Sequence, residues 1–143
     1  MADAIDSFKG QYSFLSNFYE FPVKYEGLIY TNAEAAFQSA KLLDSEERKQ
    51  FCALSPAVAK RLGRKVNLRP DWETVKVGIM EEILFSKFTD CEDLKEKLLA
   101  TEDAELIEGN TWNDRFWGVC KGTGKNMLGK TLMKVRDRIR QAG

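Results

Sequence analysis

Residues 31–43 read Thr31-Asn32-Ala33-Glu34-Ala35-Ala36-Phe37-Gln38-Ser39-Ala40-Lys41-Leu42-Leu43, and their apolar side chains cover most of the circumference of a helix. A helix that is apolar nearly all round is normally a buried one. Thr31 and Glu34 have the spacing of a capping box, so we predict that the helix opens there and runs to about Asp44.

A narrow polar stripe interrupts this apolar surface. Glu34, Gln38 and Lys41 fall within about 60° of arc, because the i, i+4, i+7 spacing places them on one face. In one interpretation Glu34 caps the backbone, while Gln38 and Lys41 pair at the surface. In the other, a carboxylate, an amide and an amine line one cleft.

The flanking segments predict further helices and a small β element. Alternation around Glu26-Gly27 predicts a hairpin over residues 22–30, and the aromatic-rich residues 12–19 are expected to be irregular and β-like. Helices are predicted over residues 46–54, 56–62 (stopped by Gly63), 71–88, 93–100 and 126–141, with a loop over 109–124. The expected fold is mainly α (α+β): a single compact multihelical domain of residues 1–143 with a small N-terminal β element.

The composition excludes several kinds of site. The 143 residues contain no histidine, which removes the commonest general base and the commonest metal ligand. The three cysteines form no CxxC or CxxxC pair, which argues against a zinc knuckle. We expect no metal and no cofactor. Proton chemistry in an enzyme of this composition must come from Asp, Glu, Lys, Tyr or Cys.

Charge and hydropathy bear on partners and location. Lys+Arg and Asp+Glu balance at 22 each, so we do not expect a global positive field that attracts nucleic acid. A local basic pocket for one phosphate group is still compatible with this balance. The acidic first residues carry no apolar run, and no stretch is long enough to cross a bilayer. A cytoplasmic protein without a membrane partner is expected.

Two lysines and a tryptophan stand out in the predicted helix 71–88. Lys76 and Lys87 lie inside its apolar arc, where a lysine either covers apolar surface with its stem and reaches water, or holds a phosphate. Trp72 begins the same stripe and is interpreted as a core residue or as a stacking platform.

The loop before the last helix has two unusual parts. Residues 118–126 place small residues before a helix, which predicts either an anion site or a glycine-rich turn capped by Asn126. In residues 110–118, aromatic and short polar side chains are typical of base or sugar binding, or of a loop pinned by its aromatics. Asp114 and Arg115 are also compatible with a plain surface pair. Further on, Arg136, Arg138 and Arg140 are interpreted as a solvated face rather than a phosphate-facing edge.

Four segments together resemble the NADAR family, also called YbiA-like, over nearly the whole chain. They are Phe14-Leu15-Ser16-Asn17-Phe18-Tyr19; Asn32 to Lys41; Gly63-Arg64 with Arg69-Pro70-Asp71-Trp72, Met80 and Lys87-Phe88; and Trp117-Gly118 with Gly124-x-Asn126-x-Leu128-Gly129-x-x-Leu132-Met133-x-x-Arg136. The chain departs from the family pattern at Ala35, where many members have a histidine after the glutamate. The mechanism here therefore cannot depend on that histidine.

The resemblance implies N-glycosidase chemistry on ribosylated substrates. Two substrate classes are associated with the family: ribosylamine-type intermediates of riboflavin synthesis, and ADP-ribose attached to guanine in nucleic acid. The implied partner is a small-molecule or nucleotide-linked ribose, with ADP-ribosylated DNA as one form. A non-catalytic module that binds ADP-ribose or NAD is the alternative. The sequence gives neither the leaving base nor the oligomeric state.

The resemblance also implies roles for individual residues. Lys41 would attack C1′ after the sugar ring opens and form a Schiff base, while Glu34 shuttles the proton. Asp114 is the candidate for a sugar hydroxyl contact or a second acid. The expected substrate-binding residues are Phe14, Asn17, Phe18, Gln38, Arg64, Trp72, Lys87, Trp117, Gly118 and Asn126, with Trp72 and Trp117 near the base and Arg64 or Lys87 near phosphate.

Overall fold

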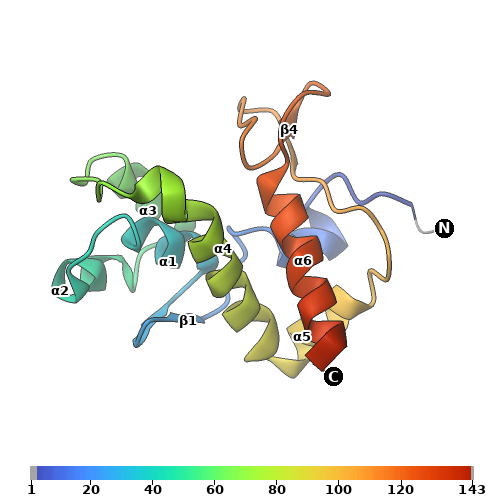
Figure 1. Cartoon of the computed structure of the whole chain (residues 1–143), viewed down its shortest axis with the longest axis horizontal. Helices are drawn as coiled ribbons and strands as arrows, with labels where there is room; N and C mark the ends of the chain where they lie inside the picture. The colour runs from blue at the N-terminus through green and yellow to red at the C-terminus, as the bar shows by residue number, and fades with distance from the viewer. Residues whose placement is uncertain (1–2, 143) are drawn as a thin grey trace. The chain divides into compact units, whose positions relative to one another are not determined.

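The computed structural model describes residues 3–142 and confirms a mainly helical fold with short strands (Figure 1). The chain forms two compact units, one of residues 17–87 and one that combines residues 1–16 with 88–143. The boundary falls after Lys87, inside the longest helix. Met1, Ala2 and Gly143, the ends of the predicted 1–143 domain, lie outside the described residues. That these residues act as one domain stays a prediction.

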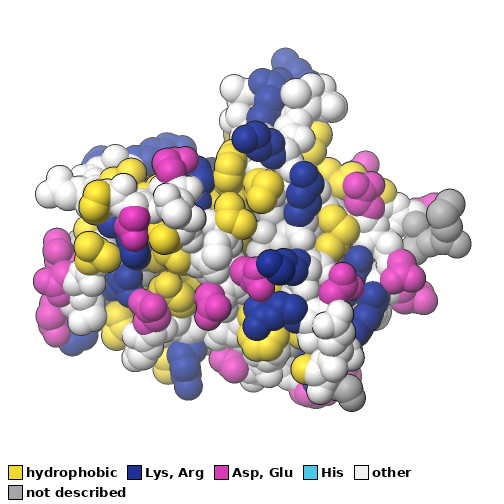
Figure 2. Space-filling model, in the orientation of Figure 1, with side chains coloured by type: hydrophobic (Ala, Val, Ile, Leu, Met, Phe, Trp, Pro, Cys, Tyr) yellow, Lys and Arg dark blue, Asp and Glu magenta, His cyan; other side chains and the backbone are white. Residues whose placement is uncertain are grey.

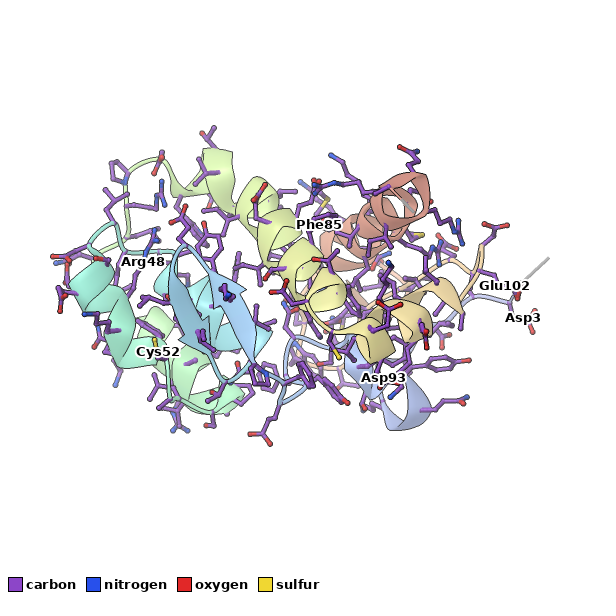
Figure 3. The ribbon with its side chains drawn as sticks, turned by 90° about the horizontal axis from the view of Figure 1, so that it is seen from below. Asp3, Arg48, Cys52, Phe85, Asp93 and Glu102 are labelled. Carbon is purple, nitrogen blue, oxygen red and sulfur yellow. The ribbon has the colours of Figure 1, made fainter. Side chains whose placement is uncertain are left out.

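The unit of residues 17–87 begins with the predicted hairpin. Strands β1 (Val23–Tyr25) and β2 (Leu28–Tyr30) pair antiparallel, with Val23 opposite Tyr30. Glu26 and Gly27 both have positive φ, 45° and 85°, as a tight two-residue turn between twisted strands requires. The Glu26 carboxylate forms an ion pair of 2.5 Å with Arg48, the last residue of helix α2 (Ser45–Arg48), which is labelled in Figure 3.

Helix α1 (Ala33–Ser39) is buried along its whole length, as its apolar circumference predicts. Its N-cap is Asn32, whose side chain accepts the backbone N–H of Ala35, so the predicted Thr31 capping box is wrong. The Thr31 hydroxyl instead donates to the carbonyl of Leu54. The helix ends at Ser39 rather than near Asp44, and Lys41 lies in the turn that follows.

Three more helices complete this unit. The predicted helix 46–54 is a short α2 (Ser45–Arg48), capped by Asp44, followed by the 3-10 turn Lys49–Phe51. Helix α3 (Pro56–Gly63) is capped by Ser55 as expected and packs against α1, and α4 runs from Trp72 to Thr89. In Figure 1 the helices α1, α2 and α3 all lie to one side of α4.

The other unit contains α5 (Glu92–Leu99) and α6 (Met127–Ala142), both close to their predicted bounds. Residues 10–15 form a 3-10 helix rather than β structure, and the predicted loop 109–124 contains the short parallel strands β3 (Gly109–Asn110) and β4 (Val119–Cys120). A strand of two residues is too short to show alternation of apolar and polar residues, so β3 and β4 could not be predicted.

Arg136 contradicts the expected solvated face of α6. Its side chain is buried, and its Nη1 donates to the Thr101 hydroxyl and the Ala104 carbonyl, 2.9 Å in each case. Arg140 is exposed and pairs with Asp103. Among residues 3–142, no helix is both long and apolar enough to cross a membrane.

Candidate functional site

Glu34 and Gln38 form a buried polar pair on α1. Their exposed fractions are 8% and 6%, and Gln38 Nε2 donates a 2.6 Å hydrogen bond to Glu34 Oε2. The Glu34 N–H donates to the Asn17 carbonyl at 3.1 Å, and the Thr31 N–H, which a capping box would direct to the Glu34 carboxylate, donates instead to the Cys52 carbonyl at 3.0 Å. The structure therefore contradicts the capping interpretation of Glu34 and places a carboxylate and an amide side by side in the interior.

Lys41 lies just beyond the end of α1, half-buried. Its Nζ donates to the Gly63 carbonyl at 3.2 Å and lies 5.9 Å from the centre of the Trp72 ring. Burial lowers the pKa of Lys41 below 10.5; the nearby Glu34 charge opposes this, while Arg64 and Lys76 add to it. A lysine with a lowered pKa is closer to the neutral, nucleophilic form.

Gly63 joins the two parts of this site. A Cβ on Gly63 would lie 1.9 Å from Gln38 Oε1, and the Gly63 carbonyl accepts from Lys41. The sequence predicts that Gly63 ends this helix, and it is indeed the last residue of α3, although its φ is not positive. Its small size lets α3 approach Gln38. Close packing between residues distant in sequence leaves no local signal from which this role can be predicted.

Asn17 lies against the same pair and is buried. Its Nδ2 donates to the sulfur of Met80 at 3.4 Å, and its carbonyl accepts the Glu34 N–H. The structure thus brings the predicted residues Asn17, Glu34, Gln38 and Lys41 into one continuous set of contacts within the 17–87 unit.

Several Lys and Arg side chains of α3 and its neighbouring segments lie near the contacts around Glu34 and Lys41. Arg64 is exposed and close enough to Lys41 to lower its pKa, while Lys60 lies over the ring of the exposed Phe18, 5.8 Å from its centre. Between residues 48 and 70 the chain has seven Lys or Arg and no Asp or Glu. Figure 2 shows Lys and Arg side chains gathered along the edge where α3 lies. The balanced total charge conceals a local basic surface.

Trp72 and Lys87 lie in the interior. Trp72 packs on Phe37, with ring centres 5.1 Å apart, so the core interpretation of this residue is confirmed. Lys87 is 1% exposed, which contradicts the expectation that its ammonium reaches water. Its Nζ lies 5.5 Å from the Tyr19 ring centre, and burial lowers its pKa to about 7.

The remaining predicted residues lie in the other unit. Asp114 Oδ1 accepts the N–H groups of Phe116 and Trp117 at 3.2 and 2.9 Å, which fixes the loop. Arg115 donates to Asn113 and to the Cys120 carbonyl. Phe14 makes an edge contact with Phe88.

Gly118 and Asn126 hold two segments of that unit together. The Asn126 amide accepts from Glu108 N–H and donates to the Leu106 carbonyl, 2.9 Å in each case. A Cβ on Gly118 would lie 2.2 Å from the Glu108 carbonyl oxygen, so only glycine fits there. The Asn126 side chain therefore ties the start of α6 to the backbone of residues 106–108.

A hollow of about 790 Å³ also lies in this unit, lined by residues of the N-terminal segment and by residues 97–104. Asp3 and Glu102, both on its wall, lie close together in Figure 3. Of the predicted site residues, its wall contains Phe14 alone, so it does not coincide with the contacts around Glu34.

Comparisons with known proteins give one consistent result. A family model described as the NADAR domain matches residues 6–140. N-glycosidase YbiA of Escherichia coli is 39% identical over 146 residues, which are 97% of this chain and 91% of that protein. An N-glycosidase of Nostoc punctiforme is 37% identical, covering 90% and 86%.

Two further matches concern a longer protein and a solved structure. A riboflavin biosynthesis protein of Vibrio vulnificus is 35% identical over 91% of this chain but only 36% of its own length. The NMR structure of Escherichia coli YbiA matches with a TM-score of 0.87 at 38% identity, covering 99% of this chain and 88% of that one.

Proposed function

The chain belongs to the NADAR domain family, and from this premise we propose that it hydrolyses the bond between C1′ of a ribose and a nitrogen, with Glu34 and Lys41 as its catalytic residues. The N-glycosidase class rests on relatives that carry this name and align over nearly their whole length. The assignment of residues rests on one observation: a buried carboxylate shares a network of contacts with a lysine of lowered pKa.

Glu34 moves the proton in this scheme. The sugar ring opens as the nitrogen lone pair forms a C1′=N bond and O4′ takes a proton from Glu34. The departing nitrogen must later gain a proton as well; Glu34, then a carboxylate, takes it from Lys41 Nζ as that nitrogen bonds to C1′ and passes it on. Gln38 holds one carboxylate oxygen at 2.6 Å, which fixes the orientation of the acid.

Lys41 supplies the nucleophile. Its neutral Nζ adds to C1′, and the original C1′–N bond breaks with its electron pair going to the protonated nitrogen, which leaves a C1′=N Schiff base on Lys41. Water then adds to C1′, Glu34 accepts its proton, and Lys41 leaves as the amine. The balance is one water consumed, one aldehyde sugar released and one N–H formed.

The other predicted residues have supporting roles in the proposal. Arg64 is proposed to hold a substrate phosphate by charge-assisted hydrogen bonds, helped by Lys60, which the sequence did not predict and which lies over the exposed ring of Phe18. Asp114 is proposed to contact a sugar hydroxyl or to act as a second acid through Oδ2, because its Oδ1 receives two backbone N–H groups.

A mass-spectrometric assay tests the proposed function. The purified protein is offered DNA that carries ADP-ribosyl-guanine and, separately, a ribosylamino-pyrimidine phosphate. Release of ADP-ribose with restored guanine identifies a hydrolase of modified nucleic acid, and cleavage of the pyrimidine alone identifies an enzyme that disposes of a metabolite. Binding without cleavage of either substrate contradicts the catalytic proposal and supports the ADP-ribose-binding module.

A further inference from the structure

Two buried side-chain oxygen atoms, on residues that hydrogen-bond to Glu34, have no hydrogen-bond partner among the described residues. They are Oε1 of Gln38 and Oδ1 of Asn17, and their residues are 6% and 7% exposed. A buried polar atom without a partner costs free energy, so such atoms in a native protein normally meet a ligand or an ordered water. Both oxygens belong to the contact network of the proposed site.

The orientation of the Gln38 amide is dictated by Glu34. If the amide were turned over, its oxygen would face the Glu34 carboxylate oxygen at 2.6 Å, and two acceptors would repel each other. Nε2 therefore faces Glu34 and Oε1 faces away from it. Gly63 leaves room for that oxygen, since a Cβ there would lie 1.9 Å from it.

The Asn17 amide is oriented by a similar argument. The sulfur of Met80 accepts weakly and has no hydrogen to donate, so Nδ2 is the amide atom that faces it. Oδ1 is then left as an acceptor. The Asn17 backbone is held in place because its carbonyl accepts the N–H of Glu34.

We propose that Asn17 Oδ1 and Gln38 Oε1 accept hydrogen bonds from the 2′- and 3′-hydroxyls of a ribose, and that the site thereby selects ribosyl over 2-deoxyribosyl ligands. The inference rests on the proposed function for the identity of the sugar. Two neutral acceptors in a contact network that also holds a carboxylate match a ligand rich in donors, and a vicinal diol offers two donors on neighbouring atoms. A phosphate, which offers only acceptors, is not suited to these oxygens.

Binding measured by NMR tests the inference without any turnover. The ¹⁵N-labelled protein is titrated with D-ribose 5-phosphate, 2-deoxy-D-ribose 5-phosphate and D-arabinose 5-phosphate, in which the 2-hydroxyl is inverted. The side-chain NH₂ signals of Asn17 and Gln38, assigned by their loss in Asn17→Leu and Gln38→Met, are followed. We expect ribose 5-phosphate to shift both signals and to bind at least about tenfold more tightly than the other two sugars.

Matched variants separate recognition of the diol from general damage. Asn17→Leu and Gln38→Met should bring the ratio of ribose to deoxyribose affinity close to one, while the exposed residues Asn67→Leu and Gln50→Met leave it unchanged. Equal binding of ribose and deoxyribose phosphates by the unaltered protein overturns the inference. A ratio that Asn17→Leu and Gln38→Met leave intact, or no binding of any of the three sugars, overturns it as well.

The two proposals fail in different ways. A protein that discriminates the sugars but cleaves no glycoside contradicts the proposed function and keeps the diol site. A protein that cleaves glycosides without discriminating ribose from deoxyribose keeps the function and removes the diol site.

Discussion

Gln38 Nε2 donates to Glu34 Oε2 across one turn of a helix that is buried from end to end. This bond gives the carboxylate a fixed direction and leaves the other end of the amide as an acceptor. A buried carboxylate next to an amide is costly as a structural device, because both groups must be desolvated. Its presence on an otherwise apolar helix is the central structural reason for placing the chemistry here.

Glu34→Gln should lower kcat by about 100- to 10,000-fold, the range typical of removing a general acid–base group. The amide keeps the size of the side chain, so the thermal unfolding midpoint should change little. Glu81→Gln, a half-buried glutamate on α4, is the matched control and should keep its activity. Unchanged kcat in Glu34→Gln would remove Glu34 from the mechanism.

The rate should rise with pH as Lys41 loses its proton. Because its pKa is lowered below 10.5, the midpoint of this rise in kcat should lie below that value. The Arg64 charge contributes to the lowering, so Arg64→Gln should move the midpoint to higher pH. Arg61→Gln, an exposed neighbour on α3, serves as the control for the pH–rate profile. A kcat independent of pH in this range would argue against a lysine nucleophile.

Gly63→Ala should reduce kcat/KM by about tenfold or more, because the new methyl group occupies the position of Gln38 Oε1. The displaced atom is the end of a flexible side chain, so a large loss of stability is not expected. Gly78→Ala is the control: nothing lies within 4 Å of its Cβ position, and it should add about 0.5–1 kcal/mol of helix stability at full activity. Equal activity of the two variants would show that Gly63 is not needed for spacing.

Lys87→Met should flatten the dependence of stability on pH. The native pKa of Lys87 is about 7 and the unfolded value is about 10.5, so between these values the unfolded state binds more protons. Stability therefore rises with pH across this window, by at most about 1.4 kcal/mol per pH unit from this group. Urea unfolding from pH 7 to 9.5 measures the slope. Lys24→Met, at an exposed lysine, should keep the slope of the unfolding free energy against pH. The same slope in Lys87→Met would contradict a lowered pKa of Lys87.

Helical periodicity and capping residues were sufficient to predict most of the fold. Helices α3 and α4 begin within a residue of their predicted starts because Ser55-Pro56 and Arg69-Pro70-Asp71 are strong local signals. The end of α1 was missed because no glycine or proline follows Ser39. There, tertiary contacts end the helix: the carbonyls of Ala40 and Lys41 accept from Arg69, 29 and 28 residues further along the chain.

The candidate site was predictable in its residue types more than in its geometry. The polar stripe of Glu34, Gln38 and Lys41 could be read from spacing, although Lys41 lies beyond the helix that the spacing assumed. The parts played by Gly63 and Met80 depend on close contacts between distant segments, which leave no periodic signal. Asp114 and Asn126 could be recognised in the sequence as polar residues of a loop. Their hydrogen bonds to the backbone of Trp117 and Leu106 could not be predicted from the sequence.

The measurement closest to the central claim is borohydride trapping during turnover, followed by peptide mapping. If Lys41 is the nucleophile, a reduced sugar adduct should form on the peptide that contains Lys41, be absent from Lys41→Ala and still be present in the Lys76→Ala control. An adduct that persists in Lys41→Ala, or that maps to another lysine, would contradict Lys41 as the nucleophile.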